Sequence, residues 1–217
     1  MKVSKSCVII KKLQLGASAF VWPVRIRFPA GCCAAAGVIE SKNLLCFIMS
    51  TAEEIIEFLG MKPLPGEGGY YVETYRCSEK ISPAALPTRY SGARSFGTAI
   101  LYVLTAETFS AMHRVRSDEI YHFYLGDPVT MLQLYPDGTS EVIILGRQIF
   151  SGQQVQVTVP KNSWQGSFVS EGGEFALLGT TVAPGFEFTD FELGQRGELL
   201  KQYPNKRDLI VKLTQAE

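Results

Sequence analysis

The sequence predicts an all-β protein, a sandwich or barrel of short antiparallel strands with a short helix at its start and a short helical segment near its end. Two observations lead to this fold class. Segments rich in β-branched and aromatic residues recur from residue 69 onward, and each is bounded by Gly, Pro, Asp or Asn. About ten such strands at short spacing are typical of a sandwich or barrel. With 46% apolar residues in 217, the chain can also bury a packed core.

The segment 51–60 predicts the short N-terminal helix. Ser50 or Thr51 can cap its first turn, and a glutamate three residues further on can complete a capping box. Gly60 then ends the helix, because glycine readily adopts the left-handed conformation that follows a last helical turn.

The strands are predicted from residue 69 to residue 193. They are residues 69–77, 97–104, 108–115, 119–126, 129–135, 140–145, 154–159, 164–169, 174–182 and 186–193. The sequence PDGT at 136–139 predicts a hairpin turn between two of them. The sequence GELLKQYP at 197–204 predicts the helical segment near the end, which stops before Pro204.

The first 48 residues differ in composition from the rest. They contain seven Lys and Arg against one acidic residue, and four of the five cysteines; the remaining 169 residues contain 14 basic and 20 acidic residues. Such a split indicates segments of different origin or role. We therefore expect a basic, cysteine-containing leader over 1–48, disordered or non-native, and one domain over 49–217 that starts naturally at Met49.

Composition also limits the partners. The formal net charge of zero does not favour nucleic-acid binding. No uncharged apolar run reaches the roughly 18 residues of a spanning helix, so no membrane segment is expected. The domain has a single cysteine, Cys77, which favours a reducing, cytoplasmic compartment, while the basic leader leaves organelle import open.

The stretch HRVRSDEIYHFYLGDP at 113–128 holds both histidines of the chain. Side chains alternate along a strand, so His113 shares a face with Val115, while Glu119 and His122 point to opposite faces of the next strand. If His113 faces inward, Glu119 can lie beside it across a strand pair. A buried carboxylate needs a partner, so the pair indicates a polar site inside the fold, although a structural ion pair stays open. His122 is expected on the outer face.

The same stretch carries a resemblance to a known family. The pattern His113-x-Val115-x₃-Glu119-x₆-Gly126 follows the spacing of the first cupin motif, and VPKNSWQGSF follows the second. The sequences PGEGGYYVETYR, TAILYVL and TVAPGFEFTDFEL add to the match. Residues 49–217 are therefore similar to a branch of the cupin superfamily known only as a domain of unknown function. This resemblance implies a double-stranded β-helix, the RmlC-like jelly-roll barrel, which is commonly dimeric.

The resemblance also implies a metal site, and here the sequence departs from the family pattern. Of the four usual ligand positions, His113 and Glu119 keep two, whereas Val115 and Gln165 occupy positions that are histidines in the family. Zinc and iron normally take three or four strong ligands, so no tightly bound metal is expected. The alternative is a weakly bound divalent ion such as magnesium on His113, Glu119 and Gln165.

We therefore expect a small-molecule-binding protein whose internal pocket is lined by His113, Glu119, Trp164 and Gln165. A metal-dependent enzyme and a storage or scaffold protein without chemistry are further alternatives. A homodimer is expected, because an antiparallel sandwich has edge strands that must be covered, and strand 69–77 is the candidate contact.

A metal-free isomerase or epimerase is the main alternative, similar to the sugar-nucleotide epimerases that share this barrel. In this reading His113 is the base, Glu119 orients the imidazole, and Tyr121 or Tyr102 donates a proton. The basic residues that could contact a nucleotide diphosphate are Arg76, Arg94 and Arg114.

Overall fold

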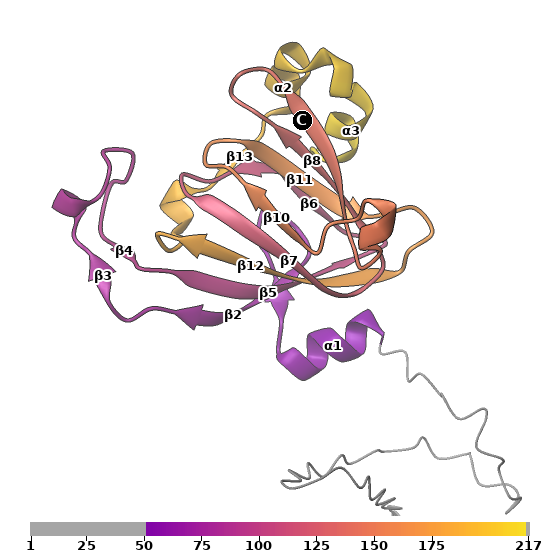
Figure 1. The fold of residues 1–217 in the computed structure, drawn as a ribbon, viewed down its shortest axis with the longest axis horizontal. Coiled ribbons are helices and arrows are strands. Elements are labelled where there is room, and N and C mark those ends of the chain that lie inside the picture. Colours follow the sequence, from indigo (N-terminus) through magenta and orange to yellow (C-terminus); the bar gives the residue numbers. More distant parts are fainter. Residues whose placement is uncertain (1–50, 216–217) are drawn as a thin grey trace, which may run out of the picture. The chain divides into compact units, whose positions relative to one another are not determined.

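A computed structural model describes residues 51–215, and the expectations for residues 1–48 lie outside these residues. The described chain forms two antiparallel sheets that share a core, with helices on their outer sides (Figure 1). Within this part of the chain, no helix is both long enough and apolar enough to cross a membrane.

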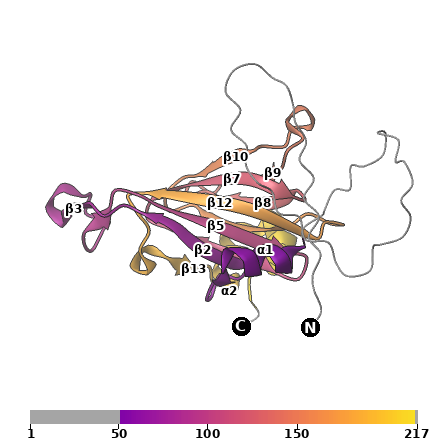
Figure 2. The ribbon, with the colours of Figure 1, turned by 90° about the horizontal axis from the view of Figure 1, so that it is seen from below.

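The first sheet has six strands. In spatial order they are β1 (Lys62–Pro63), β2 (Tyr70–Arg76), β5 (Thr98–Thr105), β12 (Phe175–Ala183), β7 (Asp118–Gly126) and β10 (Gln156–Val159). Figure 2 shows β2, β5, β12, β7 and β10 side by side. The second sheet has five strands, in the order β13 (Glu192–Leu193), β6 (Phe109–Arg114), β11 (Trp164–Val169), β8 (Val129–Leu134) and β9 (Ser140–Leu145). A separate ribbon pairs β3 (Lys80–Ile81) with β4 (Arg94–Ser95).

Alternation along the strands directs one face of each sheet into a shared core. On β7 the buried residues include Glu119, Tyr121 and Phe123, and the residues between them are less buried. Tyr121 and Phe123 pack in one apolar cluster with Met131 and Leu145 of the second sheet. Full burial of one large apolar side chain contributes roughly 1.5–3 kcal/mol, so this cluster holds the two sheets together.

The helix α1 (Ala52–Leu59) covers the outer face of the first sheet. Thr51 caps it in the predicted capping box: the Thr51 hydroxyl accepts from the N–H of Glu54, whose carboxylate accepts from the N–H of Thr51. Gly60 ends the helix in the left-handed conformation, with φ of 63°. The apolar side of α1 packs in a cluster with Val103 of β5.

Two short helices, α2 (Arg196–Gln202) and α3 (Arg207–Lys212), pack against the second sheet. The first confirms the helical segment predicted near the end of the chain. The second was not predicted, because RDLIVK is short and contains β-branched residues. It forms because Ile210 and Leu213, three residues apart, lie on one side of the helix and reach the apolar cluster that contains Trp164.

Nine of the ten predicted strands are present within two residues of their predicted ends. The PDGT turn is also present, with Gly138 at φ of 88°. The prediction of a strand over 186–193 was wrong. Its aromatic residues line a cavity instead of alternating across a sheet, and the segment forms the 3₁₀-helix η3 (Phe188–Asp190) and the two-residue strand β13.

Gly126 ends β7 opposite Ala176 of β12, with φ of 96°. A Cβ atom at this position would overlap the carbonyl oxygen of Phe175. We expect Gly126→Ala to lower the free energy of unfolding by about 3 kcal/mol, since it adds a clash to the strain of a positive φ.

The matched control is Gly138→Ala, because Gly138 has a similar φ of 88° but open space around it. Gly138→Ala should lower the free energy of unfolding by the cost of the backbone strain alone, about 1–2 kcal/mol. Urea denaturation compares the two variants, and equal losses would contradict this account of Gly126.

Candidate functional site

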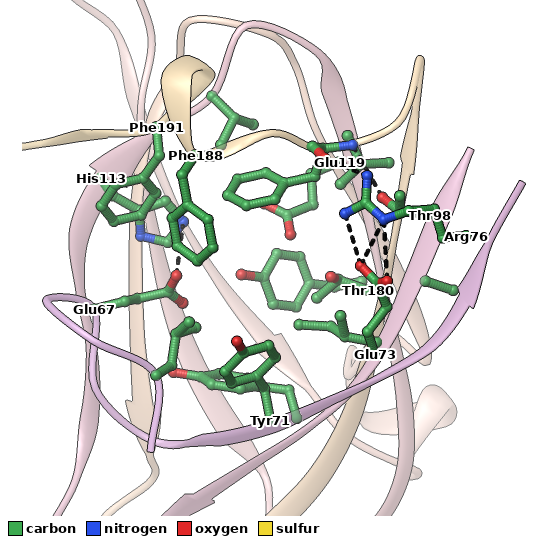
Figure 3. Close-up of a pocket in the computed structure, with 18 of the residues that line it drawn as sticks. Glu67, Tyr71, Glu73, Arg76, Thr98, His113, Glu119, Thr180, Phe188 and Phe191 are labelled. Carbon is green, nitrogen blue, oxygen red and sulfur yellow. Dashed lines mark hydrogen bonds and ion pairs between the residues drawn. The ribbon is translucent and has the colours of Figure 1, made fainter. Parts of the chain in front are cut away.

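A cavity of about 240 Å³ opens between the two sheets (Figure 3). Side chains from β2, β5, β6, β7 and β12 line it, together with the loop before β2 and the segment around η3. The polar and charged lining residues are Glu67, Glu73, Arg76, Thr98, His113, Glu119 and Thr180. The aromatic lining residues are Tyr71, Tyr102, Tyr121, Phe186, Phe188 and Phe191. A concave site with apolar walls and a few converging polar groups is typical of small-molecule binding.

His113 lies on β6 and is 2% exposed. Its Nδ1 atom is 2.8 Å from the carbonyl oxygen of Ala111. A carbonyl oxygen only accepts hydrogen bonds, so Nδ1 carries a proton and Nε2 is the nitrogen left to act as a base. The Phe191 ring stacks on the imidazole, with ring centroids 5.1 Å apart. The ring of His113 is therefore held in one orientation and one tautomer.

Gln165 connects the polar groups. It lies directly opposite His113 in the pairing of β11 with β6. Its Nε2 atom is 2.9 Å from Nε2 of His113, from Oε2 of Glu119 and from the hydroxyl of Tyr121. An amide nitrogen has two protons, so it can donate to only two of these three groups at once. The Tyr121 hydroxyl can only accept from this amide nitrogen, so its own proton is left for another acceptor.

Glu119 lies on β7 and is 7% exposed. Burial raises the pKa of its carboxyl to about 7, and the charge of Glu67 adds to this; the charge of His113 and hydrogen bonds from Thr180 and Gln165 act in the opposite direction. The carboxyl therefore changes its protonation state near neutral pH, which is the range in which an acid–base group is useful.

Glu67 is the site residue that the sequence reasoning missed. Its side chain is 10% exposed, with Oε2 3.8 Å from Nε2 of His113, while Oε1 accepts a hydrogen bond of 2.7 Å from Ser110 (Figure 3). Glu67 belongs to the glycine-rich sequence PGEGGYY. The two residues that follow it, Gly68 and Gly69, have positive φ values. The sharp turn that these glycines permit directs Glu67 into the cavity. The glycines in the sequence indicate a turn, but they do not determine whether the turn directs Glu67 into the cavity or toward the solvent.

Two tyrosines stand beside the acidic groups. Tyr102 donates a hydrogen bond of 2.8 Å to the carbonyl of Gly68, and both Tyr102 and Tyr121 are almost completely buried. Burial and the nearby carboxylates raise the pKa of both phenols well above the usual value. Each hydroxyl therefore stays protonated and can donate a hydrogen bond.

The predicted site residues thus come together with one exception. His113, Glu119 and Tyr121 line the cavity, and the Gln165 amide nitrogen lies within hydrogen-bond distance of all three from the strand behind. The expectation for Trp164 was wrong. Neighbouring residues of a strand point to opposite faces, so Trp164 packs outside the barrel with α2 and α3, beneath the guanidinium of Arg114.

A second correction concerns the strands themselves. β6 and β7 were expected to pair with each other, but they belong to different sheets: β6 pairs with β11 and β13, and β7 pairs with β10 and β12. His113 and Glu119 therefore approach from opposite sides of the barrel and are joined through Gln165.

His122 lies on the other face of β7, as alternation predicts. Its ring nitrogens are 3.2 Å from the Thr181 hydroxyl and 3.2 Å from the Gln156 amide, and the ring stacks on Tyr124. It is not among the residues that line the cavity.

The three arginines do not form the expected cluster for a nucleotide diphosphate. Arg76 lies at the cavity but is paired with Glu73 and Glu187. Arg94 is buried against Asp190, at 2.6 Å, and this ion pair holds the segment that carries Phe188 and Phe191 over the cavity. Arg114 pairs with Glu192 outside the barrel. A substrate that needs several free guanidinium groups does not fit this arrangement.

Comparison with known proteins identifies the family. A profile described as Cupin superfamily (DUF985) matches residues 53–194, which is more than half of the chain. The chain belongs to this family. The predicted jelly-roll fold is confirmed for this cupin, and neither the family description nor the names of the relatives state an activity.

Three proteins have clear sequence or structural similarity to this cupin. The uncharacterized protein YML079W of Saccharomyces cerevisiae is 28% identical over 132 residues, which covers 57% of this chain and 66% of that protein. Protein SO0799 from Shewanella oneidensis has a crystal structure that matches with a TM-score of 0.69 and 32% identity, over 78% of this chain and 100% of that chain. The structure of a hypothetical protein from Leishmania major matches with a TM-score of 0.69 and 28% identity, over 77% of this chain and 100% of that chain.

The cavity of this cupin does not fit the metal that many cupins bind. Among residues 51–215, no three side chains of His, Cys, Asp or Glu converge on one point. Val115 lines the cavity with an apolar side chain, and the Gln165 amide nitrogen, rather than its oxygen, faces His113 and Glu119. The absence of a tightly bound transition metal stays a prediction.

The buried carboxyl of Glu119 should make stability depend on pH. The folded protein retains this proton to higher pH than the unfolded chain does, so the free energy of unfolding falls as the pH rises from about 4.5 to about 7. Glu119→Gln removes this decline. At pH 8 we expect the variant to be more stable than the wild type by about 1–3 kcal/mol, with a smaller difference at pH 5.

Urea denaturation at the two pH values measures this difference. The control is Glu171→Gln, which changes an exposed glutamate and should not alter the pH dependence. A Glu119→Gln protein that is less stable than the wild type at pH 8 would contradict the prediction.

Proposed function

We propose that this cupin binds a small organic molecule in the cavity between its sheets, where His113, Glu67 and Glu119 contact it. The observation that supports this most directly is that three titratable side chains, those of His113, Glu67 and Glu119, line the same cavity as six aromatic side chains. The three titratable side chains are at most 10% exposed, so their hydrogen bonds to a ligand are stronger than at the surface.

Acid–base chemistry on the bound molecule is the second candidate. The tautomer of His113 leaves Nε2 as a base, and Tyr121 has a protonated hydroxyl on the same cavity. A base and an acid around one ligand can move a proton from a carbon beside a carbonyl and return it, which is an isomerase or epimerase reaction. The substrate would carry no diphosphate, because the arginines are already paired.

The binding proposal predicts different roles for the two histidines. A thermal-shift screen of small organic molecules against the wild-type protein supplies the ligands to be tested. His113→Ala should abolish the shift that these ligands produce, because it removes a group that touches them. His122→Ala should keep the shift and act only through stability, by losing the bonds to Thr181 and Gln156.

Circular dichroism of both variants verifies that they fold. A His113→Ala protein that retains the full ligand-induced shift would contradict the proposed site. No shift with any molecule, together with no retained ligand in native mass spectra of protein purified without chelators, would favour the scaffold alternative.

We also propose a homodimer that uses the free side of β2. β1 covers only Tyr70 and Tyr71, so within the described residues the remainder of β2 has no strand on that side. Tyr75, on this part of β2, is 55% exposed. An unpaired strand edge with an exposed aromatic residue is suited to pairing with a second copy.

Tyr75→Glu should shift the protein toward the monomer, because it places a charge in the contact. Phe150→Glu is the matched control, since Phe150 is a fully exposed aromatic residue on a different element, η2 (Ile149–Ser151). Light scattering coupled to size exclusion measures the mass of each. A wild-type monomer, or an unchanged dimer in Tyr75→Glu, would contradict the proposed contact.

A further inference from the structure

We propose that the ligand of this cavity is a small organic cation, an ammonium group carrying a few carbon atoms. This inference rests on the proposed function and adds the chemical class of the ligand. It is drawn from the charges that line the cavity, from the way each is already bonded, and from the aromatic walls.

The charged lining is acidic. Three carboxylates, those of Glu67, Glu73 and Glu119, line the cavity, against one guanidinium, that of Arg76, and the imidazole of His113. The lining carries an excess of negative charge above about pH 7, where Glu119 has lost its proton. An anionic ligand would be repelled, and a cationic ligand attracted, in a site where burial strengthens both effects.

Most N–H groups of the one guanidinium are already bonded to carboxylate or carbonyl oxygens. Nε and one terminal nitrogen of Arg76 bond to the carboxylate of Glu73, at 2.7–3.2 Å. The other terminal nitrogen bonds to Glu187 at 2.9 Å and to the carbonyl of Phe186 at 3.2 Å. The Nδ1 proton of His113 is likewise held by the carbonyl of Ala111. The cavity therefore presents few cationic donors to a carboxylate, sulfate or phosphate.

The two deep carboxylates, in contrast, are incompletely compensated. Oε1 of Glu67 is bonded to Ser110, and within residues 51–215 the one basic group paired with its carboxylate is Nε2 of His113, 3.8 Å from Oε2. Glu119 receives hydrogen bonds from Gln165 and Thr180, and within residues 51–215 no basic side chain lies within 4 Å of its carboxylate oxygens in an ion pair. Burying carboxylates in this way is unfavourable unless an opposite charge lies close. An ammonium group between them would supply that charge.

The aromatic walls suit the same ligand. Phe186 and Phe188 meet edge to face, with centroids 5.2 Å apart, and Phe191 covers the imidazole. Tyr71 and these rings surround the space in front of the acidic wall (Figure 3). The face of an aromatic ring attracts cations, and several rings around one site are the usual means of binding quaternary ammonium groups. A volume of about 240 Å³ lies below the usual range of drug-sized pockets, which indicates a small ligand.

Isothermal titration calorimetry with two probes tests the inference. Choline carries the quaternary ammonium, and 3,3-dimethyl-1-butanol has the same shape without the charge. In amine-free buffer at pH 8, we expect choline to bind at least about tenfold more tightly than the alcohol. Glu67→Gln and Glu119→Gln should each weaken choline by about tenfold and leave the alcohol nearly unchanged, whereas the exposed Glu171→Gln should change neither.

The pH dependence gives a second readout. The titratable groups that face Glu119 are His113, Glu67, Tyr102 and Tyr121. The affinity for choline should rise between pH 6 and pH 8 as Glu119 loses its proton. The Glu119→Gln variant should lose this rise, because the carboxyl that titrates in the wild type is absent from it.

The outcomes distinguish this inference from the proposed function. If the alcohol binds as tightly as choline, or if the two glutamate variants bind choline as the wild type does, the cation inference is overturned while a binding cavity remains. If choline does not bind at all, the inference is overturned, and the thermal-shift screen with His113→Ala still decides whether the cavity binds any other molecule.

Discussion

The amide of Gln165 holds the polar site of this cupin together. It reaches from the second sheet to Glu119 and Tyr121 on the first, and at the same time to His113 beside it. A carboxyl group buried between two sheets needs such a partner, because the apolar core on either side offers none. This contact joins the imidazole, the carboxyl and the tyrosine hydroxyl, and it favours the charged form of the carboxyl against the effect of burial.

The same position explains how this chain differs from metal-binding cupins. A histidine at 165 would direct a lone pair toward His113 and Glu119, whereas the glutamine presents an amide nitrogen to both. Val115 is the second position that lacks a metal-binding side chain. The side of the cavity that holds a metal in other cupins is therefore formed here by hydrogen-bonded side chains and Val115, next to the aromatic lining residues. The fold is kept because the strands pack through an apolar cluster that includes Phe123 and Met131.

The cavity is closed by a segment that is not a regular strand. Asp190 in η3 pairs with Arg94 at 2.6 Å, and both side chains are buried. This contact fixes the backbone from which Phe188 and Phe191 extend over the cavity. Phe188 is nevertheless 59% exposed, so part of the aromatic wall faces the solvent at the entrance. A ligand would meet this ring before it reaches the carboxylates.

Much of the fold was determined by local sequence. Strand positions follow from period-two alternation, and the cap of α1 follows from Thr51, Glu54 and Gly60, because these features depend on neighbouring residues alone. Alternation also placed His113 and Glu119 inward and His122 outward. The cupin spacing then located Gln165 beside them.

Only the tertiary structure decided which strands pair and which side chains complete the site. It assigned β6 and β7 to different sheets, moved Trp164 out of the cavity, and brought Glu67 in from a turn that lies more than forty residues before His113. It also showed that the arginines are already paired. These contacts join residues distant in the chain, and their geometry depends on how two complete sheets pack. Local periodicity contains no information about that packing.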